Sequence, residues 1–127
     1  MIKDEIRAVL KNDADLIESL GGLSENNQRV YTDFSPNAVE FPRVLITELF
    51  CDDDINGDNE SGFERLKIRL TVYSKSKDYF SISRKIKKIL KQNYFMSTVS
   101  LGGDAFERDT KVYSKTVDVE LLIESED

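Results

Sequence analysis

The sequence predicts an α+β fold: a two-layer sandwich in which two amphipathic helices cover one face of a mostly antiparallel, mixed sheet of about five strands. Two segments carry apolar residues at helical spacing, one at the start of the chain and one after its middle. Other segments alternate apolar and polar residues with the period of two that marks strands. Turn residues join most of these strands directly, which favours antiparallel pairing. With 127 residues, the chain is expected to form a single domain over 1–127.

The first helix is predicted from its apolar spacing. Apolar residues follow an i, i+4, i+7, i+8 pattern from Ile2 to Leu10, which is typical of one buried helix face. Asn12-Asp13 breaks the pattern and offers a new N-cap. The apolar face then continues over 16–20, and Gly21-Gly22 ends it, because glycine is favoured just after a helix.

Three strands are predicted between the two helical segments. Residues 30–31 form a short strand, and Pro42, which lacks a backbone donor, delays the next strand to 43–50. The acidic stretch 52–62 is predicted to be a long loop. The third strand has the clearest alternation, with apolar residues at every second position: Leu66, Ile68, Leu70 and Val72.

The second helix is predicted to run from Ser76 or Asp78 to Gln92, followed by two strands. Its apolar stripe is Tyr79, Ile82, Ile86, Ile89 and Leu90. At about 100° per residue, the basic residues project from the opposite side. The last two strands, 94–101 and 111–123, are expected to be joined at Gly102-Gly103-Asp104. The predicted order is therefore α-β-β-β-α-β-β.

The composition excludes several classes of enzyme. The chain has no His and a single cysteine, Cys51. It therefore lacks the commonest general base and the residues of a zinc cluster, and it cannot form an internal disulfide. No apolar run is long enough to span a membrane, and the first residues show no secretory signal. No cofactor is expected, and a binding or structural role is favoured.

Charge is unevenly distributed along the chain, although the net charge is only −6. Segment 75–91 has seven basic residues and one acidic residue, a net +6, whereas segment 48–64 has seven acidic residues and no basic one. The segment from Asp118 to the end adds five further acidic residues. Such segregation points to two surfaces of opposite sign.

Two motifs in the acidic region resemble metal sites but do not complete them. Asp52-Asp53-Asp54-Ile55-Asn56-Gly57 matches the opening of an EF-hand loop, but Phe63 stands where the bidentate Glu is required. Glu64 and Lys67 are spaced E-x-x-K, which places them on opposite faces of a strand and not together as in a nuclease site. We therefore predict no metal site and read the acidic stretch as a solvated loop.

Five short segments occur in an order and spacing typical of a known family. They are Leu20-Gly21-Gly22, Arg29-Val30-Tyr31, Phe41-Pro42-Arg43-Val44, the strand Ile68–Tyr73 with Ser74-Lys75-Ser76, and the segment Phe106–Tyr113. In this order they resemble the tail-terminator proteins of long-tailed bacteriophages, also called tail completion or head–tail joining proteins. The resemblance covers nearly the whole chain.

The resemblance implies a structural role without catalysis. Such proteins form a six-membered ring at the head-proximal end of the tail tube, stop tube polymerisation and present a surface to the neck proteins of the head. The implied partners are the chain itself, the tail-tube protein and a head-side neck or connector protein, with no membrane, and with DNA only passing through the ring lumen. The implied location is the virion neck, after assembly in the host cytoplasm.

The interface residues are predicted from charge alone. We expect the basic helix face to meet acidic groups of the next subunit or of a neck partner: Arg84, Lys87, Lys88 and Lys91 on one side, and Asp52, Asp53 and Asp54 on the other. Two alternatives stay open. One is another neck or tail-tube subunit of the same fold, and the other is a nucleic-acid-binding accessory protein that uses the basic helix.

Overall fold

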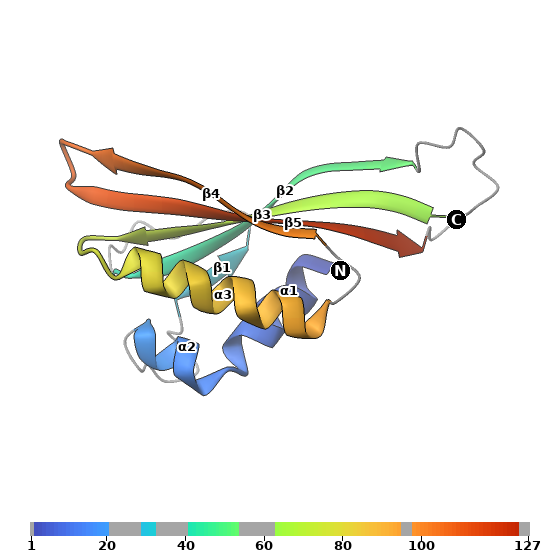
Figure 1. Cartoon of the computed structure of the whole chain (residues 1–127), viewed down its shortest axis with the longest axis horizontal. Helices are drawn as coiled ribbons and strands as arrows, with labels where there is room; N and C mark the ends of the chain where they lie inside the picture. The colour runs from blue at the N-terminus through green and yellow to red at the C-terminus, as the bar shows by residue number, and fades with distance from the viewer. Residues whose placement is uncertain (1, 21–28, 33–40, 54–62, 95–97, 125–127) are drawn as a thin grey trace.

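In a computed structural model of the chain, five strands form one sheet and the helices lie together on one of its faces (Figure 1). The structure describes residues 2–20, 29–32, 41–53, 63–94 and 98–124, and only the backbone at 50–53, 63, 123 and 124. The elements are α1 (Ile2–Lys11), α2 (Ala14–Ser19), β1 (Val30–Thr32), β2 (Arg43–Asp53), β3 (Phe63–Ser74), α3 (Tyr79–Asn93), β4 (Thr98–Glu107) and β5 (Val112–Glu124).

The sheet confirms the predicted α+β class. Its strand order is β1-β2-β3-β5-β4, with β1 parallel to β2 and every other neighbouring pair antiparallel. The sheet is long and strongly twisted. One end of the β4–β5 hairpin extends past the helices on one side, and the ends of β2, β3 and β5 extend on the other (Figure 1).

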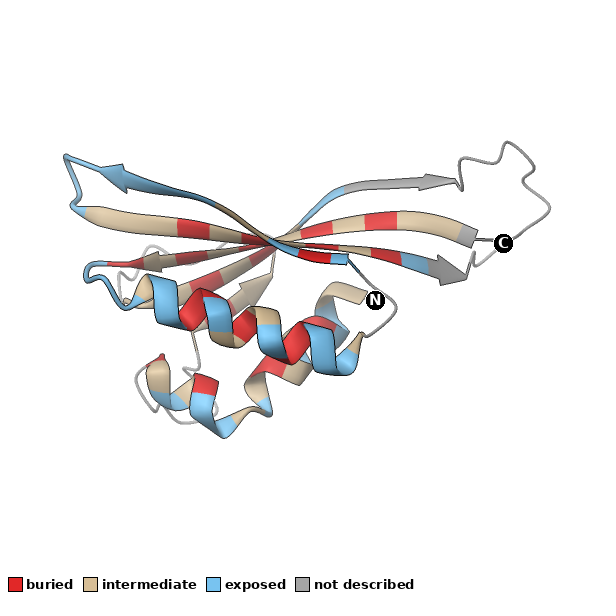
Figure 2. Cartoon of the chain, viewed as in Figure 1, coloured by how far each residue is buried: buried red, intermediate tan, exposed pale blue. Residues whose placement is uncertain are grey.

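The core lies between the sheet and the helices. In β3, the alternate residues Leu66, Ile68, Leu70 and Val72 are buried, as their spacing predicts, while the residues between them are only half-buried (Figure 2). The apolar stripe of α3 packs into the same core through Ile82, Ile86, Ile89 and Leu90. The opposite face of the sheet carries no described helix and forms an open face.

The first predicted helix is two helices, divided at the predicted break. Asp13 has an extended backbone and caps α2: its Oδ1 accepts a hydrogen bond from the Leu16 N–H at 2.9 Å. This capping supplies an acceptor for an otherwise unpaired N–H of the first turn. Ile6 and Leu10 of α1 and Leu16 of α2 are all buried, so both helices contribute to the same core.

Three boundaries differ from the sequence prediction. The strand expected over 94–101 begins at Thr98, because Tyr94 caps the end of α3, and 95–97 lie outside the described residues. The stretch expected to be a loop from Asp52 begins within β2, which runs to Asp53, while 54–62 lie outside the described residues. Gly102-Gly103 is not the turn between the last strands. It lies inside β4, where the register shifts between Leu101 and Asp104, and the turn is further on, at 108–111.

The register shift marks a β-bulge, and side-chain contacts explain its position. The carbonyl oxygen of Gly102 accepts a hydrogen bond from Lys115 Nζ at 2.9 Å. A Cβ added at Gly102 would overlap the hydroxyl of Thr116 on β5. At the true turn, Lys111 takes the left-handed conformation, with φ 58°, as the last residue of a short hairpin loop often does.

The two glycines should therefore respond differently to alanine. We expect Gly102→Ala to lower the free energy of unfolding by about 1–3 kcal/mol, because the new methyl group displaces Thr116 in a packed hairpin. Gly103→Ala is the matched control, since no atom lies within 4 Å of its Cβ position. Urea unfolding of both variants measures the difference, and equal stabilities would show that the close approach at Gly102 does not constrain the bulge.

Candidate interaction surfaces

The basic face of α3 is where the sequence places it. Arg84, Lys88 and Lys91 are exposed, whereas Lys87, expected to face solvent, is half-buried. The four residues line a groove of about 390 Å³ together with Gln92 and with Leu101 of β4. Long basic side chains cover apolar surface with their stems and keep the charge in water, which accounts for the partial burial of Lys87.

Two other basic residues of segment 75–91 have partners within the chain. Lys85 Nζ donates a hydrogen bond to Ser19 Oγ at 2.5 Å and lies 3.5 Å from Asp15 Oδ1, which ties α3 to α2. Lys75 Nζ lies 5.3 Å from the centroid of the Phe41 ring. Arg84 makes a contact of the same kind with the Phe80 ring, at 5.7 Å, so of these three residues Lys85 is the one whose charge is paired with a carboxylate.

The predicted acidic residues are far from this groove in the order of the sheet. Asp52 and Asp53 belong to the end of β2, where their Cα partners are Arg65 and Glu64, and Asp54 lies outside the described residues. The groove lies beside β4. Since β3 and β5 separate β2 from β4, the acidic and basic regions lie toward opposite edges of the sheet. The fold therefore keeps the acidic end of β2 and the basic groove of the same subunit apart.

A buried lysine anchors the base of the β4–β5 hairpin, and the sequence analysis missed it. Lys115 is only 7% exposed. Its Nζ lies 2.6 Å from Asp104 Oδ1 and also donates to Gly102 O. One signal in the sequence could have identified Lys115 as inward-facing. It lies two and four positions before Val117 and Val119, so the alternation of β5 places all three on the same, buried face.

Aromatic residues tie the same hairpin to α3. The rings of Tyr79 and Tyr113 are stacked, with centroids 5.2 Å apart, and Phe106 packs on Tyr113 at 4.6 Å. The Tyr79 hydroxyl lies 3.1 Å from Asp104 Oδ2 and donates to it. Desolvation first, and then this hydrogen bond, raise the pKa of Tyr79. The hairpin base is therefore fixed to the helical layer.

The carboxylate of Asp104 should make hairpin stability depend on pH. The hydrogen bond from Lys115 is the main cause that lowers the pKa of Asp104 below its ordinary value. A carboxylate with a lowered folded-state pKa stabilises the fold above its unfolded pKa, and that contribution is lost as the pH falls through the folded pKa. We expect Asp104→Asn to lower the urea midpoint at pH 7, and to lower it less at an acidic pH below the lowered folded-state pKa of Asp104.

The control for this experiment is Glu107→Gln, which removes a carboxylate from the same hairpin but leaves the pair of Lys115 and Asp104 intact. If Asp104→Asn lowers the midpoint equally at both pH values, the ion pair is not the source of the effect.

The open face of the sheet is polar in its centre and carries paired charges of both signs there. Arg69 and Asp118, on adjacent strands, form a two-point contact with N–O distances of 2.8 and 3.0 Å. This hydrogen bonding raises the pKa of Arg69. Arg65 and Glu120 form a second pair at 3.4 Å. Paired charges of both signs make this part of the face a poor site for a strongly charged ligand.

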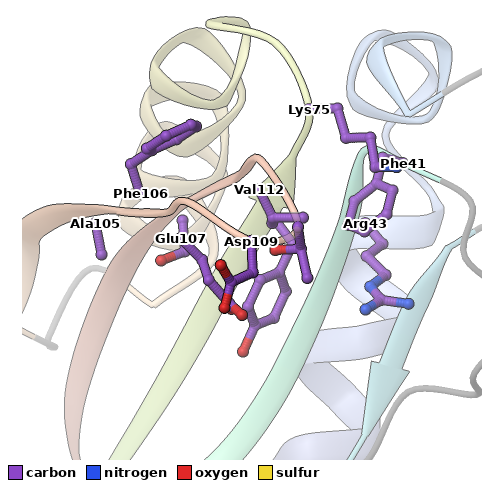
Figure 3. A pocket seen from close by; sticks show the side chains of 11 residues that line it. Phe41, Arg43, Lys75, Ala105, Phe106, Glu107, Asp109 and Val112 are labelled. Atoms are coloured by element: carbon purple, nitrogen blue, oxygen red, sulfur yellow. The ribbon is translucent and has the colours of Figure 1, made fainter.

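A pocket of about 810 Å³ lies on the open face, at the end of the sheet near the β4–β5 turn (Figure 3). Its floor crosses the sheet, because Arg43, Tyr73, Ser114 and Ala105 are successive Cα partners on β2, β3, β5 and β4. The Arg43 guanidinium carbon lies 5.6 Å from the centroid of Tyr73.

The walls of this pocket differ in charge. Lys75 and Arg43 lie on the side of β2 and β3, and Glu107 and Asp109 lie on the hairpin side (Figure 3). Arg43 also packs on Phe41, with its guanidinium carbon 4.7 Å from the ring centroid. A pocket with both signs of charge and aromatic surface suits a protein partner better than a nucleic acid, whose phosphates carry one sign only.

The described residues do not show a metal site. Among them, no three His, Cys, Asp or Glu residues are grouped so that they could hold a metal ion. The EF-hand-like stretch falls largely on 54–62, outside the described residues. None of the helices in the described part of the chain is long and apolar enough to cross a membrane.

Comparison with known proteins identifies the family. No curated protein matches the chain. A family model described as tail completion protein gp17 matches residues 4–124, which include nearly all of α1 and every later helix and strand of the described structure. This match confirms the resemblance found in the sequence. The chain therefore belongs to the tail completion protein gp17 family, and so to the structural proteins of phage tails.

Proposed function

We propose that this protein is a non-enzymatic subunit that caps the head-proximal end of the phage tail tube as a ring of six copies. The ring ends tube polymerisation and provides the surface to which the head joins. The observation that carries this proposal is the family match over 4–124.

The distribution of surfaces supports ring formation. A ring requires a head-to-tail contact in which two different patches of neighbouring subunits meet. The basic groove of α3 lies beside β4, and the acidic end of β2 lies across the sheet from it. Patches at opposite edges of one subunit do not contact each other within it. Each is placed to contact the complementary patch of a neighbouring subunit.

The proposed partners follow from this position in the virion. They are further copies of the chain, the tail-tube protein below the ring and a neck or connector protein on the head side. Assembly takes place in the host cytoplasm, and DNA only passes through the lumen. The pocket near the β4–β5 turn, whose walls carry charges of both signs, is a candidate surface for one of the protein partners.

Solution mass and electron microscopy test the proposal. The purified chain is measured alone and after mixing with tail-tube protein. We expect six-fold rings at the ends of tubes and shorter tubes in the presence of the chain. Tubes of unchanged length without end-bound protein would overturn the capping role. Incorporation of the chain along the tube would instead indicate a tube subunit of the same fold. Binding to neck protein but not to the ends of tubes would indicate another neck component.

A second candidate function, nucleic-acid binding through α3, is favoured by the exposure of Arg84, Lys88 and Lys91. Binding through phosphate contacts falls steeply with salt. Retention on DNA that disappears between low and moderate salt would support this function, and a lack of retention at low salt would remove it.

A further inference from the structure

We propose that neighbouring copies join edge to edge, so that the first part of β4 in one copy, Thr98–Leu101, pairs antiparallel with β2 beyond Ile46 in the next copy. The pairing would make one sheet that continues from subunit to subunit. This inference rests on the proposed ring and states how its subunits are joined.

The sheet has two strand edges that no described strand covers. β4 is the last strand in the order, and among the described residues it is paired only with β5. On the other side, β1 is only three residues long and covers β2 from Val44 to Ile46. Beyond Ile46, β2 continues to Asp53 and has a described partner, β3, on one side only.

The first part of β4 has none of the usual devices that prevent strands from pairing, whereas β2 has a register shift between Glu48 and Phe50, so the paired stretch must accommodate an irregularity there. Natural edge strands are commonly interrupted by Pro or Lys, kept very short or bulged. β4 has no Pro or Lys, and neither does β2 beyond Ile46. The β4 bulge begins only after Leu101, where the carbonyl of Gly102 turns to Lys115. The stretch before it is regular, and its small residues Thr98 and Ser100 are exposed.

The strand directions fit a head-to-tail contact. β2 runs antiparallel to β3, β3 to β5 and β5 to β4, so β4 and β2 of one copy point in opposite directions. If the next copy is related by rotation about an axis roughly along the strands, its β2 keeps its direction and meets β4 antiparallel. The same rotation keeps all helices on one side of the joined sheet. The contact uses two different edges, as a closed ring requires.

Charge favours the same arrangement. The groove lined by Arg84, Lys87, Lys88 and Lys91 includes Leu101, the last residue of the proposed β4 edge. The β2 edge carries Glu48, which is exposed, and has Asp52 and Asp53 at its end. Edge pairing therefore brings the acidic strand of one copy beside the basic groove of another. Complementary charges of this kind fix register and speed encounter.

Paired cysteines test the contact in assembled rings. After Cys51→Ser, a cysteine at Thr47 or Leu49 is combined with one at Thr98 or Ser100, giving four double variants. A disulfide requires Cα atoms within about 7 Å. For at least one pair, we expect oxidation of the rings to shift the protein from monomer to covalent multimers of up to six copies on a non-reducing gel. The matched control replaces the β2 cysteine by Thr71→Cys, since β3 is flanked by strands on both sides.

Amide hydrogen exchange of the wild-type protein gives an independent measurement. Residues 47–53 and 98–101 should gain protection when rings form, while the centre of β3 should not change. Rings without this protection and without cross-linking would overturn the edge pairing and leave the proposed function standing. A dimer cross-linked through Ser100→Cys alone would show two-fold pairing of β4 with itself and would also overturn it. If no rings form under any condition, both proposals fail.

Discussion

Replacing Lys87 and Lys88 together by glutamate should leave the subunit folded and reduce the yield of joined phage particles by about tenfold or more. Exposed ion pairs are individually worth only about 0–1 kcal/mol. Reversing two charges in a groove that meets acidic groups does more than remove pairs, because juxtaposed like charges cost several kcal/mol. A cost of about 1.4 kcal/mol already lowers an association constant tenfold.

The fold should tolerate the change because the apolar stripe of α3 is untouched. Ile86 and Leu90 are fully buried, whereas Lys88 is exposed and Lys87 half-buried. The measurement is the mass of the assembled protein at low and moderate salt, together with complementation of a phage that lacks the gene. Wild-type assembly should itself weaken with salt, because the Debye length falls to about 3 Å at 1 M.

A matched control separates this effect from net charge. Lys77→Glu with Arg108→Glu changes the net charge by the same amount at two exposed residues outside the groove. This control should assemble and complement like the wild type. If the Lys87 and Lys88 variant does so as well, the basic face of α3 is only a solvated surface.

Leu70→Ala should produce the largest loss of stability, about 2–5 kcal/mol, as is usual for truncation of a buried leucine. Leu70 is fully buried in the middle of β3, with Ile46 of β2 and Val117 of β5 as its Cα partners. The truncation leaves a cavity that three paired strands cannot close by moving independently. Since small domains are stable by only about 5–15 kcal/mol, this loss is a large part of the total free energy of unfolding.

Leu122→Ala is the control, because it removes the same atoms from a strand residue that is 64% exposed. Its effect on urea unfolding should stay within about 0.5 kcal/mol. Comparable losses for the two variants would mean that the core does not lie between the sheet and the helices.

Local patterns in the sequence were enough to predict most elements. The alternation over 66–72 identified β3 and its buried face, and the helical spacing over 79–90 identified α3 and placed Arg84 and Lys88 on its exposed side. The break at Asn12-Asp13 predicted the cap of α2 correctly. These features depend on residues that are close in the sequence, within one or two turns of a helix or along one strand. They can therefore be predicted without knowing how distant segments pack.

The predicted turn at Gly102-Gly103 was wrong for a physical reason. Glycine pairs are typical of turns, but they also permit a bulge where another chain segment approaches closely. Lys115 and Thr116, more than ten positions later, decide between the two by occupying the space beside Gly102. That contact exists only once β4 and β5 have paired.

Local patterns along the chain were sufficient to predict the α+β class, the buried faces and the segregation of charge into a basic and an acidic segment. The folded sheet was needed to learn which strands stand at its edges, that Lys115 is buried against Asp104, and that Arg43 and Glu107 line one pocket. The difference arises from distance along the chain. Hydrophobic periodicity acts between near neighbours, whereas contacts such as that of Arg69 with Asp118, 49 positions apart, arise from strand order, which local patterns do not encode.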